Sequence, residues 1–453
     1  TNVEDHANKR HTKRHTKRPT KTTARHQVHH QIHQMYTWDQ SSTKRFTINL
    51  NEPASTRWDT VLNDLALRKS LLLLMNSLES LFADEKDPPP PGFTNRNAFF
   101  QQLTTNLFLQ LKHMDAEYLV DEMKGIATNL NVPVWDVALL HLLYEAEGGG
   151  CTSIVLNPNQ DNTPSTMVAP PLFGRVLDWD FAPLLVPLTI EVEFVRHGNV
   201  VLEGLTFAGF IGLLTARKPN MAAVAVHFRR TLDDDHDDED GGGGDTRTPS
   251  PPPPSPSNPA WPVALLVRHV LQAPRLETFQ EIVLLFQHSP LWAPCYFVLA
   301  GTTPQEILSL TRNTYQCTAT RTMDSNTSML VQTNVDDEEQ DDEGDFDFMA
   351  SRHRERIVAN YFSTSSREEQ DETKLWQVMS LPPVLDEASV HCCVFGACCP
   401  MSSAVKATDA THLEEERRKA ANLLWESSVT MLVGSVLFTV ALSLFVKWTY
   451  GVE

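Results

Sequence analysis

One cysteine stands in a context suited to a nucleophile. Cys151 directly follows Gly148-Gly149-Gly150, precedes the strand-like run Thr152–Val155, and is isolated in sequence from the six other cysteines. A thiolate is a strong nucleophile, but a free thiol has a pKa of about 8.5 and needs a nearby base. Cys151 is therefore the candidate nucleophile, with a plain buried thiol as the other interpretation.

A second polar pair follows in another strand-like segment. Gly174–Trp179 reads GRVLDW, which places Arg175 and Asp178 three positions apart. Residues three apart fall on opposite faces of an ideal strand, so both reach one site only if the strand ends or bends between them. An ordinary surface ion pair is the alternative.

Many short segments resemble, in the same order, those of acid ceramidase and of the acid amidase that hydrolyses N-acylethanolamines. The resemblance runs from about Phe46 to Phe395, interrupted by insertions. The segments are FTINLNEPASTRWD (46–59), EMKGIATNLNVP (122–133), LLYE (142–145), CTSIV (151–155), GRVLDW (174–179), FAGFIGLLT (207–215), LVRHVL (266–271), APCYFVLAGT (293–302), TRN (311–313), VQTN (331–334) and LPPVL (381–385). A lone CTS triplet would be a weak signal, whereas this ordered series is a specific one.

The resemblance implies an α+β fold of the N-terminal-nucleophile hydrolases: an αββα sandwich of two stacked sheets between helical layers, preceded by a helical subunit. It also implies that a precursor cuts its Gly150–Cys151 bond. The released α-amino group, with a reference pKa of about 7.7–8.0, would act as general base and return the proton to the leaving amine. Glycines before the bond permit the strained turn that thiol attack requires.

The resemblance also implies roles for other residues. Arg175 should lie beside the thiol and the substrate carbonyl, Asp178 should hold the α-ammonium, and Asn334 of VQTN should donate to the tetrahedral oxyanion. A further family arginine has no clean match here, and its candidates are Arg352, Arg354 and Arg356. We prefer Arg354 and expect no metal and no organic cofactor.

The chain departs from the family pattern at three places. Val176 replaces the asparagine usual after the Gly-Arg pair, and His227-Phe228-Arg229 stands where the family has an acidic residue before arginine. No cysteine precedes Cys151, so the disulfide that links the two subunits of acid ceramidase cannot form. These departures keep open a catalytically inactive, lipid-binding membrane protein on the same fold.

Periodicity predicts helices first and strands later. Helices are expected at Trp58–Phe82, Ala98–Lys112, Glu117–Leu130, Val134–Tyr144, Pro262–Gln272, Thr278–Gln287, Arg352–Tyr361 and Lys374–Met379. Strands are expected at Phe46–Leu50, Ser153–Leu156, Gly174–Leu177, Leu188–Phe194, Val200–Phe207, Gly209–Thr215, Ala222–Phe228, Tyr296–Ala300, Ile307–Thr311 and Met329–Thr333, with Val390–Phe395 as the last strand. This order favours an α+β sandwich preceded by a helical segment.

Charge and composition divide the chain further. The net charge of -19 is concentrated in the acidic runs Asp233–Asp240 and Asp336–Asp347. The basic, His-rich tail 1–35 and the acidic, Gly- and Pro-rich insertion 232–259 are expected to be disordered, and no nucleic-acid role is expected. After the tail we predict a helical subunit at 36–150 and a catalytic domain at 151–403, and the insertion lies within the catalytic domain.

The other cysteines include a C-C-x4-C-C cluster, formed by Cys392, Cys393, Cys398 and Cys399. Its spacing matches no standard zinc site, so a local disulfide in an oxidising compartment is the first expectation. Metal binding and lipid acylation are the alternatives.

The chain ends in an apolar segment. Residues 428–446 carry no charge and suffice to cross roughly 30 Å of hydrocarbon as a helix, preceded by a juxtamembrane segment 404–427. Lys447, Trp448 and Tyr450 follow as interface anchors, and a buried core helix is the other interpretation. The expected partners are thus a lipid amide substrate (ceramide, or alternatively an N-acylethanolamine), the membrane, and the chain's own cleaved N-terminal subunit.

Protease protection tests the expected topology. We expect the catalytic domain in the lumen of lysosomes or another endomembrane compartment, so protease added to sealed vesicles should spare the region around Cys151 until detergent is added. Tail anchoring with a cytosolic domain is the alternative, because Arg417, Arg418 and Lys419 precede the span and only Lys447 follows it closely. Digestion without detergent would support that alternative, whereas glycosylation at Asn326-Thr327-Ser328 would support the lumen.

Overall fold

The computed structural model describes residues 36–41, 43–82, 95–146, 149–157, 169–229, 259–323, 328–336, 346–363 and 370–407. The predicted tail 1–35, the insertion 232–259 up to residue 258, the segment 408–427 and the predicted span 428–446 lie outside them. Among the described helices, none combines the length and apolar character needed to cross a membrane.

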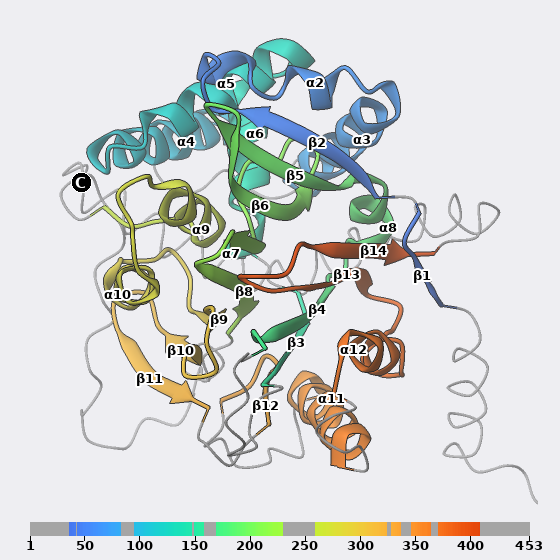
Figure 1. Ribbon diagram of the computed structural model, residues 1–453. Helices are drawn as coiled ribbons and strands as arrows, with labels where there is room; N and C mark the ends of the chain where they lie inside the picture. Colours follow the sequence, from blue (N-terminus) through green and yellow to red (C-terminus); the bar gives the residue numbers. More distant parts are fainter. Residues whose placement is uncertain are drawn as a thin grey trace, which may run out of the picture. The chain divides into compact units, whose positions relative to one another are not determined.

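Two sheets organise the described residues from Thr37 on (Figure 1). The first has the strand order β1-β14-β13-β4-β3-β12, and the second β11-β10-β9-β8-β7-β6-β5-β2. The strands of the first are β1 (Trp38–Asp39), β14 (Ser402–Lys406), β13 (Ser389–Phe395), β4 (Leu172–Asp178), β3 (Cys151–Leu156) and β12 (Met329–Gln332). Those of the second are β11 (Cys317–Thr322), β10 (Ile307–Arg312), β9 (Cys295–Ala300), β8 (Ala222–Phe228), β7 (Thr215–Lys218), β6 (Asn199–Phe207), β5 (Thr189–Arg196) and β2 (Lys44–Asn49).

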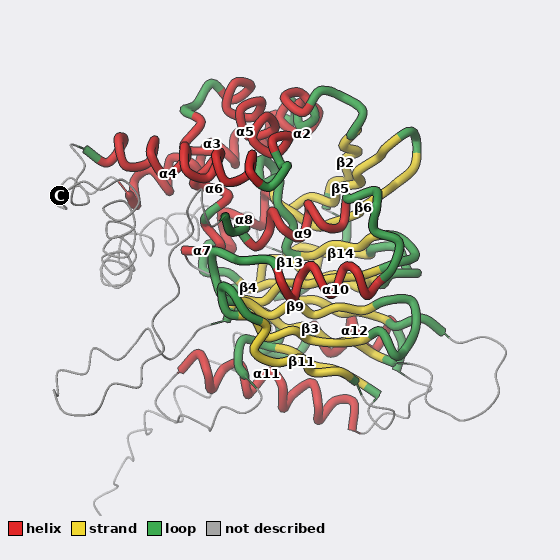
Figure 2. Tube along the Cα trace, turned by 90° about the vertical axis from the view of Figure 1, so that its left-hand side faces the viewer, coloured by secondary structure: helices red, strands yellow, loops and turns green. Residues whose placement is uncertain are grey.

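The sheets stack face to face, with helices on both outer faces. Side chains alternate along a strand, and β3 shows this alternation. Val155 packs between the sheets in a cluster with Val298 of β9, whereas Ile154 packs outward against α11 (Phe346–Ser363) and α12 (Glu372–Met379). Apolar residues of the second sheet share a cluster with α9 (Val263–Gln272) and α10 (Phe279–His288), which lie across its strands in Figure 2. The predicted order of layers, αββα, is therefore confirmed.

The residues before Cys151 form a helical group and also complete both sheets. The helices are α2 (Asp59–Leu62), α3 (Leu65–Phe82), α4 (Arg96–His113), α5 (Glu117–Leu130), α6 (Val134–His141) and α7 (Leu143–Ala146); α8 (Ala182–Leu185) follows later. In addition, β2 pairs in parallel with β5, and β1 pairs antiparallel with β14. The segment expected to be a helical subunit thus contributes an edge strand to each sheet.

Some element predictions were wrong. The single helix expected at Trp58–Phe82 is interrupted after Leu62, because the Asp64 carboxylate accepts hydrogen bonds from the backbone N–H groups of Ala66 and Leu67 and starts a new helix. No strand covers Gly209–Thr215, because Gly209 adopts φ +84° in a turn and β7 only begins at Thr215.

Besides the two-residue β1, two strands were not predicted. Strand β11 is largely exposed and polar, so it lacks the alternation of apolar residues that a half-buried strand shows. Strand β14 follows the predicted last strand, β13, with which it pairs antiparallel. Both strands depend on hydrogen bonds to a neighbour rather than on their own pattern.

The predicted disulfide in the cysteine cluster is absent. All seven cysteines, each within the described residues, carry free thiols. Successive residues of a strand face opposite sides, so Cys392 packs toward α11 and α12 while Cys393 packs between the sheets. The described residues also hold no group of three or more His, Cys, Asp or Glu side chains placed to bind a metal ion.

A buried carboxylate ties the N-terminal helices to the sandwich. Glu122 of α5 accepts two hydrogen bonds from the Arg268 guanidinium of α9, at 2.5 and 2.7 Å, and neither side chain is exposed. Arg57 and the Trp58 indole also donate to this carboxylate, at 3.0 and 2.8 Å. One charged group therefore connects elements on both sides of Cys151.

We expect Glu122→Ala to lower the free energy of unfolding by about 3–5 kcal/mol, because it leaves the Arg268 guanidinium buried without a counter-charge. Urea denaturation followed by circular dichroism measures the change. The control is Glu117→Ala on the same helix, where an exposed pair with Lys112 contributes little. Equal midpoints for the two variants would contradict this role of Glu122.

Candidate active site

The candidate nucleophile is the first residue of β3, and the end of β4 lies beside it. Cys151 is fully buried and pairs in register with Leu177, one residue before Asp178 ends β4. Arg175 pairs with Ser153 in the middle of the same ladder. The strand therefore ends at Asp178. Because the regular alternation of side chains stops there, Asp178 and Arg175 can both reach the site around Cys151.

The thiol has a buried cation as its neighbour. Arg175 Nη2 lies 2.9 Å from Cys151 Sγ and donates at 2.7 Å to the Val226 carbonyl of β8. Arg175 is fully buried, and no described carboxylate forms an ion pair with it. Burial raises the pKa of the Cys151 thiol in the uncut chain, and the guanidinium opposes this shift because it stabilises the thiolate.

The peptide before Cys151 is held against the end of β4. The Asp178 N–H donates to the Gly150 carbonyl at 2.9 Å, so a backbone donor faces the carbonyl of the predicted scissile bond. A Cβ on Gly149 would lie 1.8 Å from the Asp178 carbonyl oxygen, and this close approach requires glycine.

Asp178 is a buried carboxyl with one open oxygen. Its Oδ1 accepts a hydrogen bond from the Ser389 hydroxyl at 2.7 Å, whereas Oδ2 has no partner among the described residues. Oδ2 would lie 3.3 Å from a Cβ on Gly150, beside the backbone that leads into Cys151. Burial and the neighbouring Asp386 carboxylate raise the pKa of Asp178.

Asn334 contacts both sides of the predicted cleavage point. Its Oδ1 accepts a hydrogen bond from the Cys151 N–H at 2.7 Å. Its Nδ2 donates to the Phe228 carbonyl at 2.9 Å and to the Gly149 carbonyl at 3.3 Å. The carboxamide is therefore at the nucleophile, with both donor hydrogens occupied in the uncut chain.

Of the three candidate arginines, the structure brings Arg354 to this place. Arg354 is buried, and its Nη2 lies 3.1 Å from Asn334 Oδ1 and 3.5 Å from the Cys151 carbonyl oxygen. Arg352 instead donates to Glu355 and to the Asp336 carbonyl, and Arg356 is exposed. All five predicted residues thus lie together around the Gly150–Cys151 bond.

His227 is a neighbour of the site to which the sequence did not assign a role. Its Nε2 lies 3.0 Å from Arg175 Nη1 and 2.7 Å from the Ser153 hydroxyl, all buried. Burial and the positive charge of Arg175 hold the pKa of His227 well below its usual range, so the ring is neutral and accepts from the guanidinium. The only signal in the sequence was that His227-Phe228-Arg229 departs from the family pattern.

Val176, the other substitution that departs from the family pattern, lies on the opposite face of the sheet from Arg175. Val176 packs on the outer face of the first sheet, in the cluster with α11 and α12, whereas Arg175 faces the second sheet. The Val176 side chain therefore packs against the helices and does not contact the Cys151 thiol.

We expect His227→Ala to slow alkylation of Cys151 by iodoacetamide about 10–100-fold at neutral pH, because Arg175 loses the acceptor that orients it toward the sulfur. The pH at which the alkylation rate increases should also be higher in His227→Ala than in the wild type, because the thiolate is less stabilised. His227→Gln should restore part of the rate through its carboxamide oxygen. Exposed His288→Ala is the control, and an unchanged pH profile in His227→Ala would refute this positioning role.

Comparisons with known proteins find relatives of two names. No family model matches the chain. An N-acylethanolamine-hydrolyzing acid amidase of Caenorhabditis elegans is 27% identical over 360 residues, covering 77% of this chain and 87% of that protein. The enzyme of the same name from Rattus norvegicus is 30% identical over 42% of this chain and 46% of its own length. Acid ceramidase of Homo sapiens is 25% identical over 76% of this chain and 81% of its own length.

One solved structure is also similar. A Caenorhabditis elegans N-acylethanolamine-hydrolyzing acid amidase ortholog aligns with 56% of this chain and 95% of its own, at 26% identity and a TM-score of 0.42. Relatives of both names match along most of the chain, from different animals. Along most of its length, this chain is thus similar to the N-acylethanolamine-hydrolyzing acid amidases and the acid ceramidases.

Proposed function

We propose that this chain cuts itself at Gly150–Cys151 and then hydrolyses the amide bond of an N-acyl lipid, with ceramide as the first candidate and an N-acylethanolamine as the second. The observation that carries this proposal is the Arg175 guanidinium, 2.9 Å from the sulfur of Cys151, which directly follows three glycines. The substrate class comes from the names of the relatives.

Self-cleavage would use the contacts of the uncut chain. The Cys151 sulfur adds to the Gly150 carbonyl carbon, and the Asp178 N–H at 2.9 Å stabilises the negative oxygen. The carbon–nitrogen bond then breaks, the thiol proton passes to the new Cys151 amine, and the acyl group remains on sulfur as a thioester. Water hydrolyses this thioester and releases residues up to Gly150 with a free carboxylate.

Lipid hydrolysis would use the same sulfur with a new base. The free amine of Cys151 takes the thiol proton, the thiolate adds to the lipid amide carbon, and the ammonium returns the proton to the leaving amine. Sphingosine is the leaving amine for ceramide and ethanolamine for the alternative. Water then hydrolyses the acyl thioester and frees the fatty acid.

The surrounding groups suit these steps. When the Gly149 carbonyl moves away, an Asn334 Nδ2 hydrogen becomes available for the substrate oxyanion, while Oδ1 still accepts from the Cys151 amine. The open Oδ2 of Asp178 lies where it can hold the ammonium. Arg354 donates to Asn334 Oδ1 and fixes the orientation of the carboxamide.

The cellular location is a separate proposal, which rests on the sequence alone. We infer a lysosomal or other endomembrane enzyme anchored by residues 428–446, with the catalytic domain in the lumen or, alternatively, a tail-anchored protein with a cytosolic domain. An inactive lipid-binding protein on the same fold is the competing function, and the residue that favours it is Phe228 in place of an acidic residue.

Chain maturation and hydrolysis are tested together. On a denaturing gel, wild-type protein should separate into two chains and the later one should begin at Cys151, whereas Cys151→Ala should remain a single, inactive chain. Cys151→Ser should process slowly, because a hydroxyl is a poorer nucleophile than a thiolate. Ceramide and an N-acylethanolamine are then assayed side by side, with Cys151→Ala as the blank.

Two results would overturn the proposal. Hydrolysis by protein with an intact Gly150–Cys151 bond would refute the mechanism. A fully cut protein that hydrolyses neither lipid would instead favour the inactive, lipid-binding alternative.

A further inference from the structure

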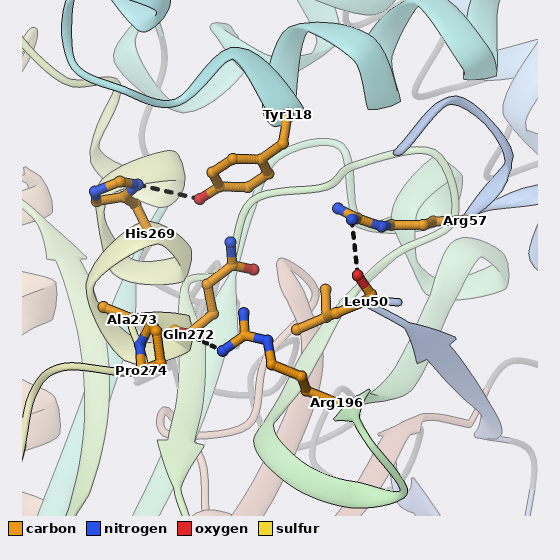
Figure 3. Close-up of a pocket in the computed structure, with 8 residues that line it drawn as sticks. All are labelled: Leu50, Arg57, Tyr118, Arg196, His269, Gln272, Ala273 and Pro274. Atoms are coloured by element: carbon orange, nitrogen blue, oxygen red, sulfur yellow. Dashed lines mark hydrogen bonds between the residues drawn. The ribbon is translucent and has the colours of Figure 1, made fainter. Parts of the chain in front are cut away.

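A pocket of about 300 Å³ opens beside the N-terminal helical group, away from the residues around Cys151. Its walls come from the end of β2, from α5, from the end of β5 and from the C-terminal end of α9 (Figure 3). The lining residues are Leu50, Arg57, Tyr118, Arg196, His269, Gln272, Ala273 and Pro274. None of them belongs to the site proposed for amide hydrolysis.

Two guanidinium groups make the pocket positive. Arg57 pairs with Glu122, but that carboxylate is also the partner of Arg268, so two cations share one anion. Arg196 makes a single hydrogen bond, at 3.3 Å to the Gln272 carbonyl, and pairs with no carboxylate among the described residues. No acidic side chain lines the pocket, so its charge favours an anion.

A buried acceptor adds a second requirement. Gln272 is only 7% exposed, and its Oε1 has no hydrogen-bond partner in the described part of the chain. Figure 3 shows its carboxamide extending into the pocket between Tyr118 and Arg196. A buried carbonyl oxygen without a donor is costly, so a ligand that brings a hydroxyl to this point would be favoured. Leu50, Ala273 and Pro274 supply apolar surface for its carbon atoms.

We propose that this pocket binds the phosphate monoester or diester of a small polyol. The phosphate oxygens lie at Arg196, since a guanidinium recognises phosphate through paired N–H donors. Arg57 contributes its positive charge, because its three nitrogens already donate to the Glu52 and Leu50 carbonyls and to Glu122. A hydroxyl of the polyol donates to Gln272 Oε1. A volume of about 300 Å³ is at the lower end of small-molecule sites, which suits a group of the size of glycerol phosphate.

The binding test uses the full chain and calorimetric titration with glycerol 3-phosphate and with inorganic phosphate. Arg196→Gln should weaken both ligands at least about tenfold, because it removes the cation that has no carboxylate partner. Gln272→Leu should weaken glycerol 3-phosphate and leave inorganic phosphate unchanged, since only the polyol carries the hydroxyl. Arg275→Gln, which removes the same charge from an exposed residue next to the pocket, should change neither.

Three outcomes would overturn the proposal. The first is no binding of glycerol 3-phosphate up to about 10 mM, because a dissociation constant above this is too weak for a specific site. The second is equal weakening of binding by Arg275→Gln and Arg196→Gln, which would show a general charge effect, and the third is no effect of Gln272→Leu on glycerol 3-phosphate binding. Unchanged thermal melting of each unliganded variant controls for folding. Cys151→Ala should bind as the wild type does, so failure of the amidase proposal leaves this result readable.

The free and the lipid-bound forms of the ligand share this chemistry, and vesicles separate them. Phosphatidylcholine vesicles with and without phosphatidylglycerol are sedimented with the protein. Sedimentation that needs phosphatidylglycerol and is lost in Arg196→Gln assigns the pocket to a lipid headgroup. Calorimetric binding without such sedimentation assigns it to a soluble phosphate ester.

Discussion

The Arg175 guanidinium, buried between the two sheets, is the constraint from which the rest of the site follows. A cation without solvent is tolerated only if its surroundings supply acceptors, and here these are the Cys151 sulfur, the Val226 carbonyl and the His227 ring. They come from β3 and β8, one strand of each sheet, while Arg175 itself lies on β4. The stacking distance of the sheets and the position of the thiol are thus coupled through one side chain.

The segment before Cys151 is held by contacts that do not depend on the peptide bond at residue 150. It supplies β1 to one sheet and β2 to the other, and its Glu122 forms the buried pair with Arg268 of α9. Residues 1–150 include no cysteine. In the proposed cut protein, edge-strand hydrogen bonds and a buried ion pair would hold these residues against the rest of the sandwich.

The two substitutions that depart from the family pattern, Val176 and Phe228, have different consequences. Val176 packs against the helical layer of α11 and α12 and does not reach the nucleophile. Phe228 lies nearer: its carbonyl accepts from Asn334, and its ring packs edge-on against Tyr144. Phe228 therefore contacts the site through its backbone, while its ring packs against an aromatic neighbour.

The local sequence pattern by itself predicts most of the helices and strands of this protein. The helix Glu117–Leu130 and most strands of the sandwich follow from periodicity, because each repeats its apolar residues with the period of its own backbone. The ordered motifs predicted Cys151, Arg175, Asp178 and Asn334 as site residues, and the structure brings these four together. Only tertiary structure selected Arg354 from three neighbouring arginines, since residues two apart on α11 point to nearly opposite sides of the helix, and of the three only Arg354 contacts Asn334. Tertiary structure alone also placed His227 beside Arg175 and formed β11 and β14, because hydrogen bonds between residues distant in sequence leave no local signal.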